Sequence, residues 1–296
     1  MTSHLTRLLL AALPAFACTA PALGQDPPPM QVVIPLPDRD FDPTEVAVPW
    51  KVLTDAGVQV VFATEQGPDG PPPECDPRLL GHPLLRVLRL TARPANVALY
   101  RQMQASPALR APIRWSEIDP ARAAGLLLPG GHWKRGMRQY LEAPALQEKV
   151  LQFMQLDKPV AAICHGPLVL ARTLDPASGA SVLQGRRVTA LTARLERSGY
   201  VLTKLVLGDY YRTYPQSVED EVRAALGPTG TFERGPAPKL FYGADSAGHV
   251  TVDGNLVTAR WPGDARSWAE AFLQLLRARA AESRAAGSLS GAVQGE

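Results

Sequence analysis

The chain has 296 residues, enough for one large α/β domain or two small ones. Hydrophobic residues make up 46% of it and charged residues 20%, which is typical of a soluble globular protein with a sizeable core. The net charge is +3, and the basic residues are mostly scattered arginines. Because no continuous basic run is present, the composition argues against a nucleic-acid partner.

The first 24 residues have the pattern of a cleavable signal peptide. Arg7 precedes a short apolar stretch broken by Pro14, and small residues lead to a cleavage site after Gly24. The stretch is too short to span a bilayer permanently. We therefore expect a periplasmic or secreted protein. The alternatives are a disordered or buried N-terminal helix, and a lipoprotein anchored through Cys18.

A βαβ unit follows the signal peptide. Residues 31–35 and 58–63 are short apolar runs, as in buried strands. Between them Asp42 has the position of a helix cap, Glu45 has the position that completes a capping box, and Gly57 ends the helix. This order predicts a parallel sheet.

The same alternation continues along the chain. Strands are predicted at 125–129, 160–163 and 188–191, helices at 96–104, 145–156, 166–174, 217–226 and 264–281, and a hairpin at 249–258. Residues 67–90 are rich in proline and glycine and are expected to be irregular, and residues 282–296 form a tail predicted to be disordered. The predicted fold class is therefore α/β, with one domain over residues 30–281.

Cys164 stands between the strand predicted at 160–163 and the following helix. A nucleophile on such an elbow projects from the carboxyl edge of the sheet, and the helix N-terminus there stabilises a thiolate. Gly166 lets strand and helix approach closely. The backbone N–H groups of His165 and Gly131 are candidates for an oxyanion hole. We predict that Cys164 is an exposed nucleophile.

Two other interpretations of this cysteine stay open. After removal of the signal peptide only Cys75 and Cys164 remain, and in an oxidising compartment two cysteines invite a disulfide. Cys164 would alternatively be an inert core residue. Cys75 lies in a proline-rich loop that nothing in the sequence brings near the elbow, so we interpret it as a bystander.

The runs around the elbow resemble a known family. Pro129-Gly-Gly-His132, followed later by Ala-Ile-Cys164-His165-Gly-Pro, is similar to the ThiJ/PfpI superfamily, and the resemblance extends from about Gln31 to Leu276. It implies a flavodoxin-like, class I glutamine amidotransferase-like sandwich with helices on both faces. Residues 185–189 and 252–258 fit the branch that contains heat-shock chaperones and glyoxalase III.

The resemblance also implies roles for several side chains. Glu45, in Glu45-Val-Ala-Val-Pro49, would place a protonated carboxyl group against the Cys164 sulfur; the alternative is that it only caps its helix. Glu196 would be the acid that orients His165, or merely an exposed loop glutamate, and Asp209 and Asp264 are rivals. Gly130 and His132 would line the pocket, unless His132 is solvent-exposed at a turn.

The resemblance further implies a cysteine-dependent enzyme acting on small carbonyl or acyl compounds. The reaction would be glyoxalase III-like, converting methylglyoxal to lactate without glutathione, or a related amide or peptide hydrolysis. A periplasmic stress chaperone or a cysteine redox sensor is the alternative. We expect no cofactor, since the five histidines have no zinc-like spacing and no phosphate loop is present.

Two further expectations concern the surroundings of the site. The chain departs from the branch at Ala259-Arg-Trp-Pro-Gly-Asp264, where a bulky ring and a cation would change the pocket wall. The cluster Tyr210-Tyr-Arg-Thr-Tyr214 would add another wall or be ordinary packing. A homodimer is possible, as is common in the family.

Overall fold

The computed structural model describes residues 30–237 and 248–293, with side chains up to residue 286. The predicted signal peptide lies outside these residues. A seven-stranded sheet forms the centre, in the order β10-β11-β7-β6-β1-β3-β5. Its strands are β1 (Gln31–Pro35), β3 (Gln59–Thr64), β5 (Ile113–Arg114), β6 (Gly125–Leu128), β7 (Val160–Ile163), β10 (Val250–Asp253) and β11 (Leu256–Ala259). All neighbours are parallel except the β10–β11 hairpin.

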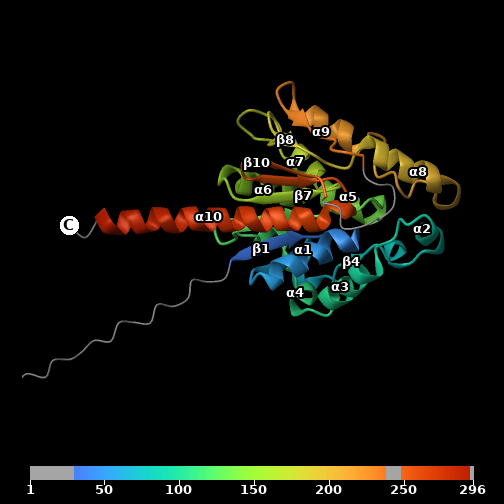
Figure 1. Ribbon diagram of the computed structural model, residues 1–296, viewed down its shortest axis with the longest axis horizontal. Helices are drawn as coiled ribbons and strands as arrows, with labels where there is room; N and C mark the ends of the chain where they lie inside the picture. Colours follow the sequence, from blue (N-terminus) through green and yellow to red (C-terminus); the bar gives the residue numbers. More distant parts are fainter. Residues whose placement is uncertain (1–29, 238–247, 294–296) are drawn as a thin grey trace, which may run out of the picture.

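Helices cover both faces of the sheet (Figure 1). The chain moves from β1 through α1 (Pro43–Asp55) to β3, but in the opposite direction from β6 through α6 (Pro144–Gln155) to β7. Since such crossovers are right-handed, the two helices lie on opposite faces. The structure thus confirms the α/β flavodoxin-like fold, whose strand order reverses between β1 and β6.

The other elements attach to this frame. The remaining helices are α2 (Pro83–Val87), α3 (Pro94–Gln104), α4 (Pro107–Arg110), α5 (Lys134–Leu141), α7 (Pro167–Arg172), α8 (Ala193–Leu207), α9 (Val218–Leu226) and α10 (Ala265–Val293). Two small parallel sheets pair β2 (Arg39–Phe41) with β4 (Glu74–Cys75), and β8 (Arg187–Val188) with β9 (Thr231–Phe232). Strand β1, strand β7 and helix α1 lie where the sequence predicts them, within one or two residues.

Three predicted elements need correction. The strand expected at 188–191 shrinks to β8 and pairs with β9 outside the central sheet. A fifteen-residue helix, α8, replaces the expected loop around Glu196. Helix α10 continues to Val293, past the expected end at residue 281, and runs beyond the body of the fold in Figure 1.

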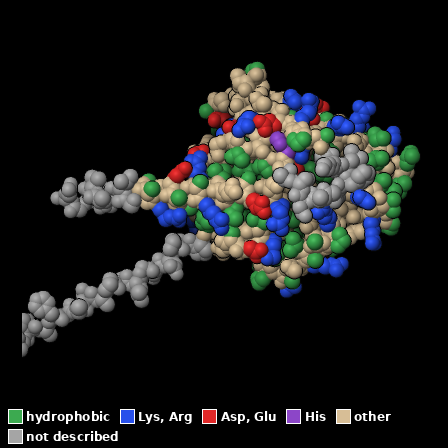
Figure 2. Space-filling model, in the orientation of Figure 1, with side chains coloured by type: hydrophobic (Ala, Val, Ile, Leu, Met, Phe, Trp, Pro, Cys, Tyr) green, Lys and Arg blue, Asp and Glu red, His purple; other side chains and the backbone are tan. Residues whose placement is uncertain are grey.

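The main core is a large apolar cluster between the sheet and its helices, and a smaller cluster forms around Leu79, Leu85 and Tyr210. The largest fully buried side chains of the main core include Trp115, Trp268, Tyr140 and Phe153. The surface is mixed: in Figure 2 the Lys and Arg side chains are spread over the visible face among acidic and apolar ones. Of the helices that the structure describes, none is both long enough and apolar enough to cross a membrane.

Candidate active site

The elbow at Cys164 is a strained turn held by hydrogen bonds. Cys164 directly follows β7 and has a φ of 60°, in the left-handed region that non-glycine residues rarely adopt. Its N–H donates to the Ala259 carbonyl at 3.2 Å, and its carbonyl accepts from Leu191 N–H at 3.2 Å. These bonds to neighbouring segments hold the residue in place. The predicted strand-to-helix elbow at Cys164 is confirmed, and the role of Cys164 as nucleophile stays a prediction.

Two glycines let the surrounding backbone close on this turn. A Cβ on Gly166 would lie 2.2 Å from the Leu128 carbonyl oxygen, so strand and helix require glycine there. A Cβ on Gly130 would lie 2.7 Å from His165 N, 2.8 Å from Cys164 Cβ and 2.9 Å from Glu45 Oε2. Gly130 is therefore where the groups of the site converge.

The sulfur is buried, which corrects the expected exposure. Cys164 is only 5% exposed. Burial raises the pKa of its thiol well above the usual value, the neighbouring Glu45 adds to the rise, and the His165 N–H acts in the opposite direction. The expected lowering by a helix N-terminus does not dominate, since α7 is six residues long and the sulfur faces an acid in a dry site. The resting group is a neutral thiol.

Glu45 supplies the acid beside the sulfur. Its side chain is fully buried, its Oε2 accepts from Gly130 N–H at 2.9 Å, and it hydrogen-bonds the Cys164 thiol. Burial first, and then the charge of Asp42, raise the pKa of this carboxyl well above its ordinary value, which favours its neutral, protonated form. The helix cap is instead Asp42, which accepts from the N–H groups of Thr44 and Glu45. The capping-box alternative for Glu45 is wrong.

His165 lies on the other side of the sulfur. Its Nδ1 is 3.5 Å from Cys164 Sγ, and its Nε2 is 3.1 Å from Thr213 Oγ1. The ring is fully buried, and this burial, with the nearby Arg172 charge, lowers its pKa to about 3. His165 is therefore neutral at physiological pH.

None of the three predicted acids contacts His165. Glu196 sits on α8 and accepts from Val218 N–H at 3.0 Å, so it caps the start of α9. Asp209 is exposed and faces Lys134 at 3.8 Å. Asp264 pairs with Arg260.

The role expected for Glu196 assumes a loop at this point, whereas residues 193–207 form helix α8. The partner is Thr213, a hydroxyl inside the Tyr-rich run. The sequence gives no acidic signal there.

Some backbone N–H groups beside the elbow already donate hydrogen bonds within the site. His165 N–H already hydrogen-bonds the Cys164 sulfur, and Gly130 N–H donates to Glu45. Gly131 follows directly, where a Cβ would lie 2.6 Å from the Asp40 carbonyl. Its role as a donor stays a prediction.

Aromatic side chains pack beside the elbow. His132 is buried, which corrects the exposed alternative, and its ring stacks on Tyr211 with centroids 4.2 Å apart and planes 10° apart. Tyr210 meets the same ring edge-on at 4.6 Å. Burial lowers the pKa of His132 to about 3, so this ring is neutral too. His132 and the tyrosine cluster thus form an apolar wall.

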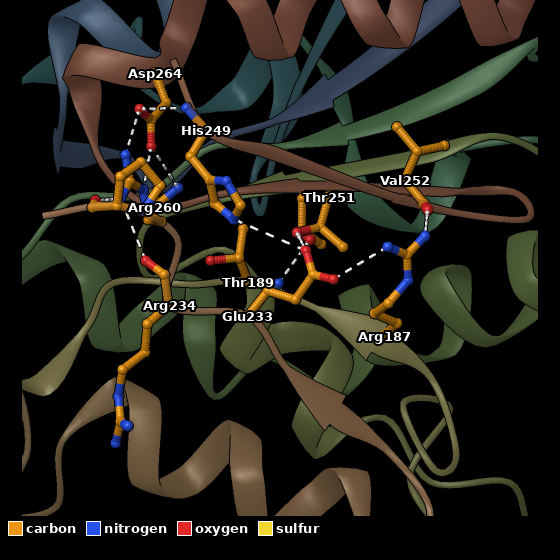
Figure 3. A network of polar contacts seen from close by, with 11 residues as sticks. Arg187, Thr189, Glu233, Arg234, His249, Thr251, Val252, Arg260 and Asp264 are labelled. Atoms are coloured by element: carbon orange, nitrogen blue, oxygen red, sulfur yellow. Dashed lines mark hydrogen bonds and ion pairs between the residues drawn. The ribbon is translucent and has the colours of Figure 1, made fainter. Parts of the chain in front are cut away.

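The departure at residues 260–264 is a structural clamp (Figure 3). Arg260 is 3% exposed and binds Asp264 through Nε at 2.8 Å, and it donates to the carbonyls of Arg234 and Pro236. Asp264 also accepts from His249 N–H at 3.0 Å. The cation is therefore neutralised inside a network that ties β11 to the residues on either side of 238–247.

Neither cysteine is in a disulfide. Cys75 and Cys164 are both free, so the disulfide alternative is wrong. Cys75 lines a separate cavity, and burial raises the pKa of its thiol to about 12, as befits a bystander. Within residues 30–237 and 248–293, no three His, Cys, Asp or Glu side chains are arranged to hold a metal ion.

The chain is similar in sequence to known proteins. The family model described as "ThiJ/PfpI family-like" matches residues 36–236. The chain belongs to this ThiJ/PfpI-like family. A deglycase of Thermococcus kodakarensis is 29% identical over 165 residues, which cover 56% of this chain and 69% of the relative. A glutathione-independent glyoxalase of Schizosaccharomyces pombe is 25% identical over 237 residues, covering 78% and 85%.

Solved structures agree on the fold of this ThiJ/PfpI-like protein. Glyoxalase III from Candida albicans superimposes with a TM-score of 0.60 at 18% identity, covering 83% of this chain and 97% of that one. A rapid encystment protein of Francisella tularensis gives a TM-score of 0.58 at 17% identity, covering 83% and 99%. The named relatives are deglycases and glyoxalases, which supports a cysteine-type enzyme of this superfamily.

Proposed function

We propose that the protein converts small reactive aldehydes, with methylglyoxal as the reference substrate, into hydroxy acids without glutathione. The observation that carries this proposal is the fully buried Glu45 carboxyl that hydrogen-bonds the thiol of Cys164 at the elbow. Addition of a thiol to an aldehyde leaves one developing alkoxide and no leaving group. A single acid beside the sulfur is therefore enough to neutralise it.

The reaction balances with the groups at the elbow. The S–H bond of Cys164 breaks and its proton passes to the neighbouring imidazole of His165. The sulfur electron pair bonds to the aldehyde carbon, the carbonyl π electrons move to oxygen, and Glu45 protonates that oxygen to give a hemithioacetal. The resulting carboxylate takes the proton from the former aldehyde carbon and delivers it to the adjacent carbon, while the hydroxyl proton moves from the first oxygen to the second. The product is a thioester of lactate on Cys164, which one water hydrolyses to lactate and the free thiol.

The relatives lend this choice support. A glutathione-independent glyoxalase matches over most of its length, and a glyoxalase III shares the fold. Deglycases among the relatives make glycated amino groups a related substrate class. Amide hydrolysis is less favoured, because it also needs a proton for the leaving nitrogen, and among the described residues the partner of His165 Nε2 is the Thr213 hydroxyl and not a carboxylate.

The test compares wild type with Cys164→Ala and Glu45→Gln for lactate formed from methylglyoxal in glutathione-free buffer. Cys75→Ala is the matched control, because Cys75 is similarly buried and lines a cavity to which Cys164 does not contribute. Lactate from wild type and the control, but not from the two elbow variants, supports the proposal. Activity that survives in Cys164→Ala, or an amide substrate turned over in place of methylglyoxal, would overturn it.

A holdase activity is a second candidate, supported by the surface of α8. Its outer side exposes Val201, Leu202, Leu205 and Val206, and Leu205 is 94% exposed. Neighbouring exposed apolar side chains of this kind mark interaction surfaces. Suppression of aggregation of a heat-denatured client should then survive in Cys164→Ala and fall in Leu205→Lys. The opposite pattern would refute it.

We also propose that the protein is exported. The support is the charged, apolar and small-residue order of the first 24 residues. Expression of the full chain in a Gram-negative host, followed by N-terminal sequencing of the periplasmic fraction, should give a chain that starts after Gly24. Full-length protein confined to the cytoplasm would contradict export.

A further inference from the structure

The hydroxyl of Thr213 joins two groups of the site. Thr213 lies between α8 and α9 and is 1% exposed. Its Oγ1 is 2.5 Å from the carbonyl oxygen of His132 and 3.1 Å from Nε2 of His165. One buried hydroxyl therefore sits between a backbone carbonyl and the ring of the histidine beside the nucleophile.

The chemistry of these partners fixes the direction of each hydrogen bond. A carbonyl oxygen only accepts, so the single hydroxyl hydrogen of Thr213 points to His132. The Thr213 oxygen can then only accept from His165, which places a hydrogen on Nε2. A neutral imidazole carries one N–H, so Nδ1 is left with a free lone pair. That lone pair faces the Cys164 sulfur at 3.5 Å.

We propose that Thr213 is a positioning residue that holds His165 in the Nε2–H tautomer, so that Nδ1 is the acceptor of the thiol proton. This role rests on the aldehyde chemistry proposed above and assigns the proton acceptor that the chemistry needs. Nδ1 of His165 lies 3.5 Å from the Cys164 sulfur, and burial favours the neutral form of the Glu45 carboxyl, which leaves Glu45 as the donor in this step.

The first step then balances. The S–H bond of Cys164 breaks and its proton goes to His165 Nδ1, while the sulfur electron pair bonds to the aldehyde carbon. The carbonyl π pair moves to oxygen, which takes the Glu45 proton. A hemithioacetal, an imidazolium and a carboxylate result from four neutral groups, so charge is conserved. The imidazolium keeps its Nε2–H on Thr213.

The opposite tautomer would give a different site. A hydrogen on Nδ1 would point at the sulfur and stabilise a thiolate, while bare Nε2 would face the oxygen lone pair of Thr213. A carboxylate at Nε2 would also hold the Nε2 hydrogen, but would favour the charged ring. A hydroxyl sets the same tautomer and leaves the ring neutral, as its pKa of about 3 requires.

The direct test is the tautomer itself. Long-range proton–nitrogen correlation spectra of ¹⁵N-histidine-labelled full-length protein separate bare from protonated ring nitrogens, and the signal missing in His165→Asn assigns the residue. We expect a bare Nδ1 and a protonated Nε2 at neutral pH in wild type. A protonated Nδ1 would overturn the proposal. Because this measurement uses wild type, it does not depend on the folding of any Thr213 variant.

Kinetics provide the second readout. Thr213→Val should lower kcat for lactate formation about 10- to 100-fold, the range for removal of a partner that orients a ligating or catalytic side chain, with KM little changed. Thr213→Ser keeps the hydroxyl and should restore most of kcat. The matched control is Thr203→Val, which also removes a buried threonine hydroxyl bonded to a carbonyl, at 2.8 Å from Gly199 O, on α8.

The outcomes separate this proposal from the one on which it rests. Thr213→Val activity equal to wild type, or an equal loss in Thr203→Val, would overturn the positioning role. Absence of lactate in wild type would overturn the proposed function, while a bare Nδ1 would still support the tautomer assignment. A protonated Nδ1 in a wild type that forms lactate would overturn the tautomer assignment and leave the proposed function supported.

Discussion

Substitution of Gly130 by alanine tests whether the elbow is as tightly assembled as its distances indicate. The added methyl would lie 2.7 Å from His165 N, 2.8 Å from Cys164 Cβ and 2.9 Å from Glu45 Oε2. Carbon atoms in contact are normally 3.5–4.0 Å apart, so each neighbour would have to shift by roughly 1 Å. All three residues are buried, and one of the atoms belongs to the backbone.

We expect two effects of Gly130→Ala. Overpacking by one methyl costs about 1–3 kcal/mol of the free energy of unfolding. In a chain of this size that corresponds to a Tm lower by roughly 2–10 °C. A 1 Å displacement of reacting groups costs on the order of 10²-fold in rate, so lactate formation should fall by about that factor.

The assay is thermal unfolding by circular dichroism alongside lactate production. Gly81→Ala is the matched control: its φ of 163° is extended backbone, and a Cβ there meets nothing within 4 Å. The control should match wild type in both measurements. If Gly130→Ala also matched wild type in both, the argument that the site is closed around this glycine would be refuted.

Three further predictions follow from buried charges. Burial raises the pKa of Asp42 to about 7, so the folded state binds more protons than the unfolded state between about pH 4 and 7. The free energy of unfolding therefore falls as pH rises through this window. In urea titrations at several pH values, Asp42→Asn, which keeps the cap, should show a smaller dependence of the free energy of unfolding on pH, and an unchanged dependence would contradict the prediction. Glu196→Ala should cost about 0.5–2 kcal/mol by removing the cap from Val218 but leave kcat intact, whereas a loss of kcat without a loss of stability would restore its catalytic role. Arg260→Met leaves Asp264 charged and buried and should cost about 3–5 kcal/mol in chemical denaturation, so a cost below about 1 kcal/mol would show that the clamp is dispensable.

The sequence predicted those parts of the fold that local patterns determine. Strands β1 and β7 are continuous apolar runs, and the N-terminus of α1 carries a capping aspartate followed by proline, so their positions follow from residue type. The elbow followed for the same reason, because an apolar strand ending in Cys-His-Gly leaves little choice of conformation. The hairpin at β10–β11 was also found, although its two-residue turn is Gly254-Asn255 and not Asp253-Gly254.

The features that the sequence does not predict are those that long-range packing determines. The surroundings of His132 and His165 depend on contacts with Tyr211 and Thr213, which come from a segment far along the chain. No local pattern specifies that a hydroxyl, and not a carboxylate, meets His165. Helix α8 buries the polar residues Glu196 and Thr203 and exposes several of its apolar residues, so its pattern does not show which face packs against the core.

Burial of the Cys164 sulfur has a kinetic consequence. A reagent can meet this atom only after neighbouring side chains have moved, so its reaction passes through a rarer, opened form of the protein. At low reagent concentration the observed rate then reports the equilibrium between closed and opened forms. At saturating concentration it reports the speed of opening alone. The rate of thiol modification therefore measures motion around the elbow. Large reagents require a wider opening than small aldehydes do.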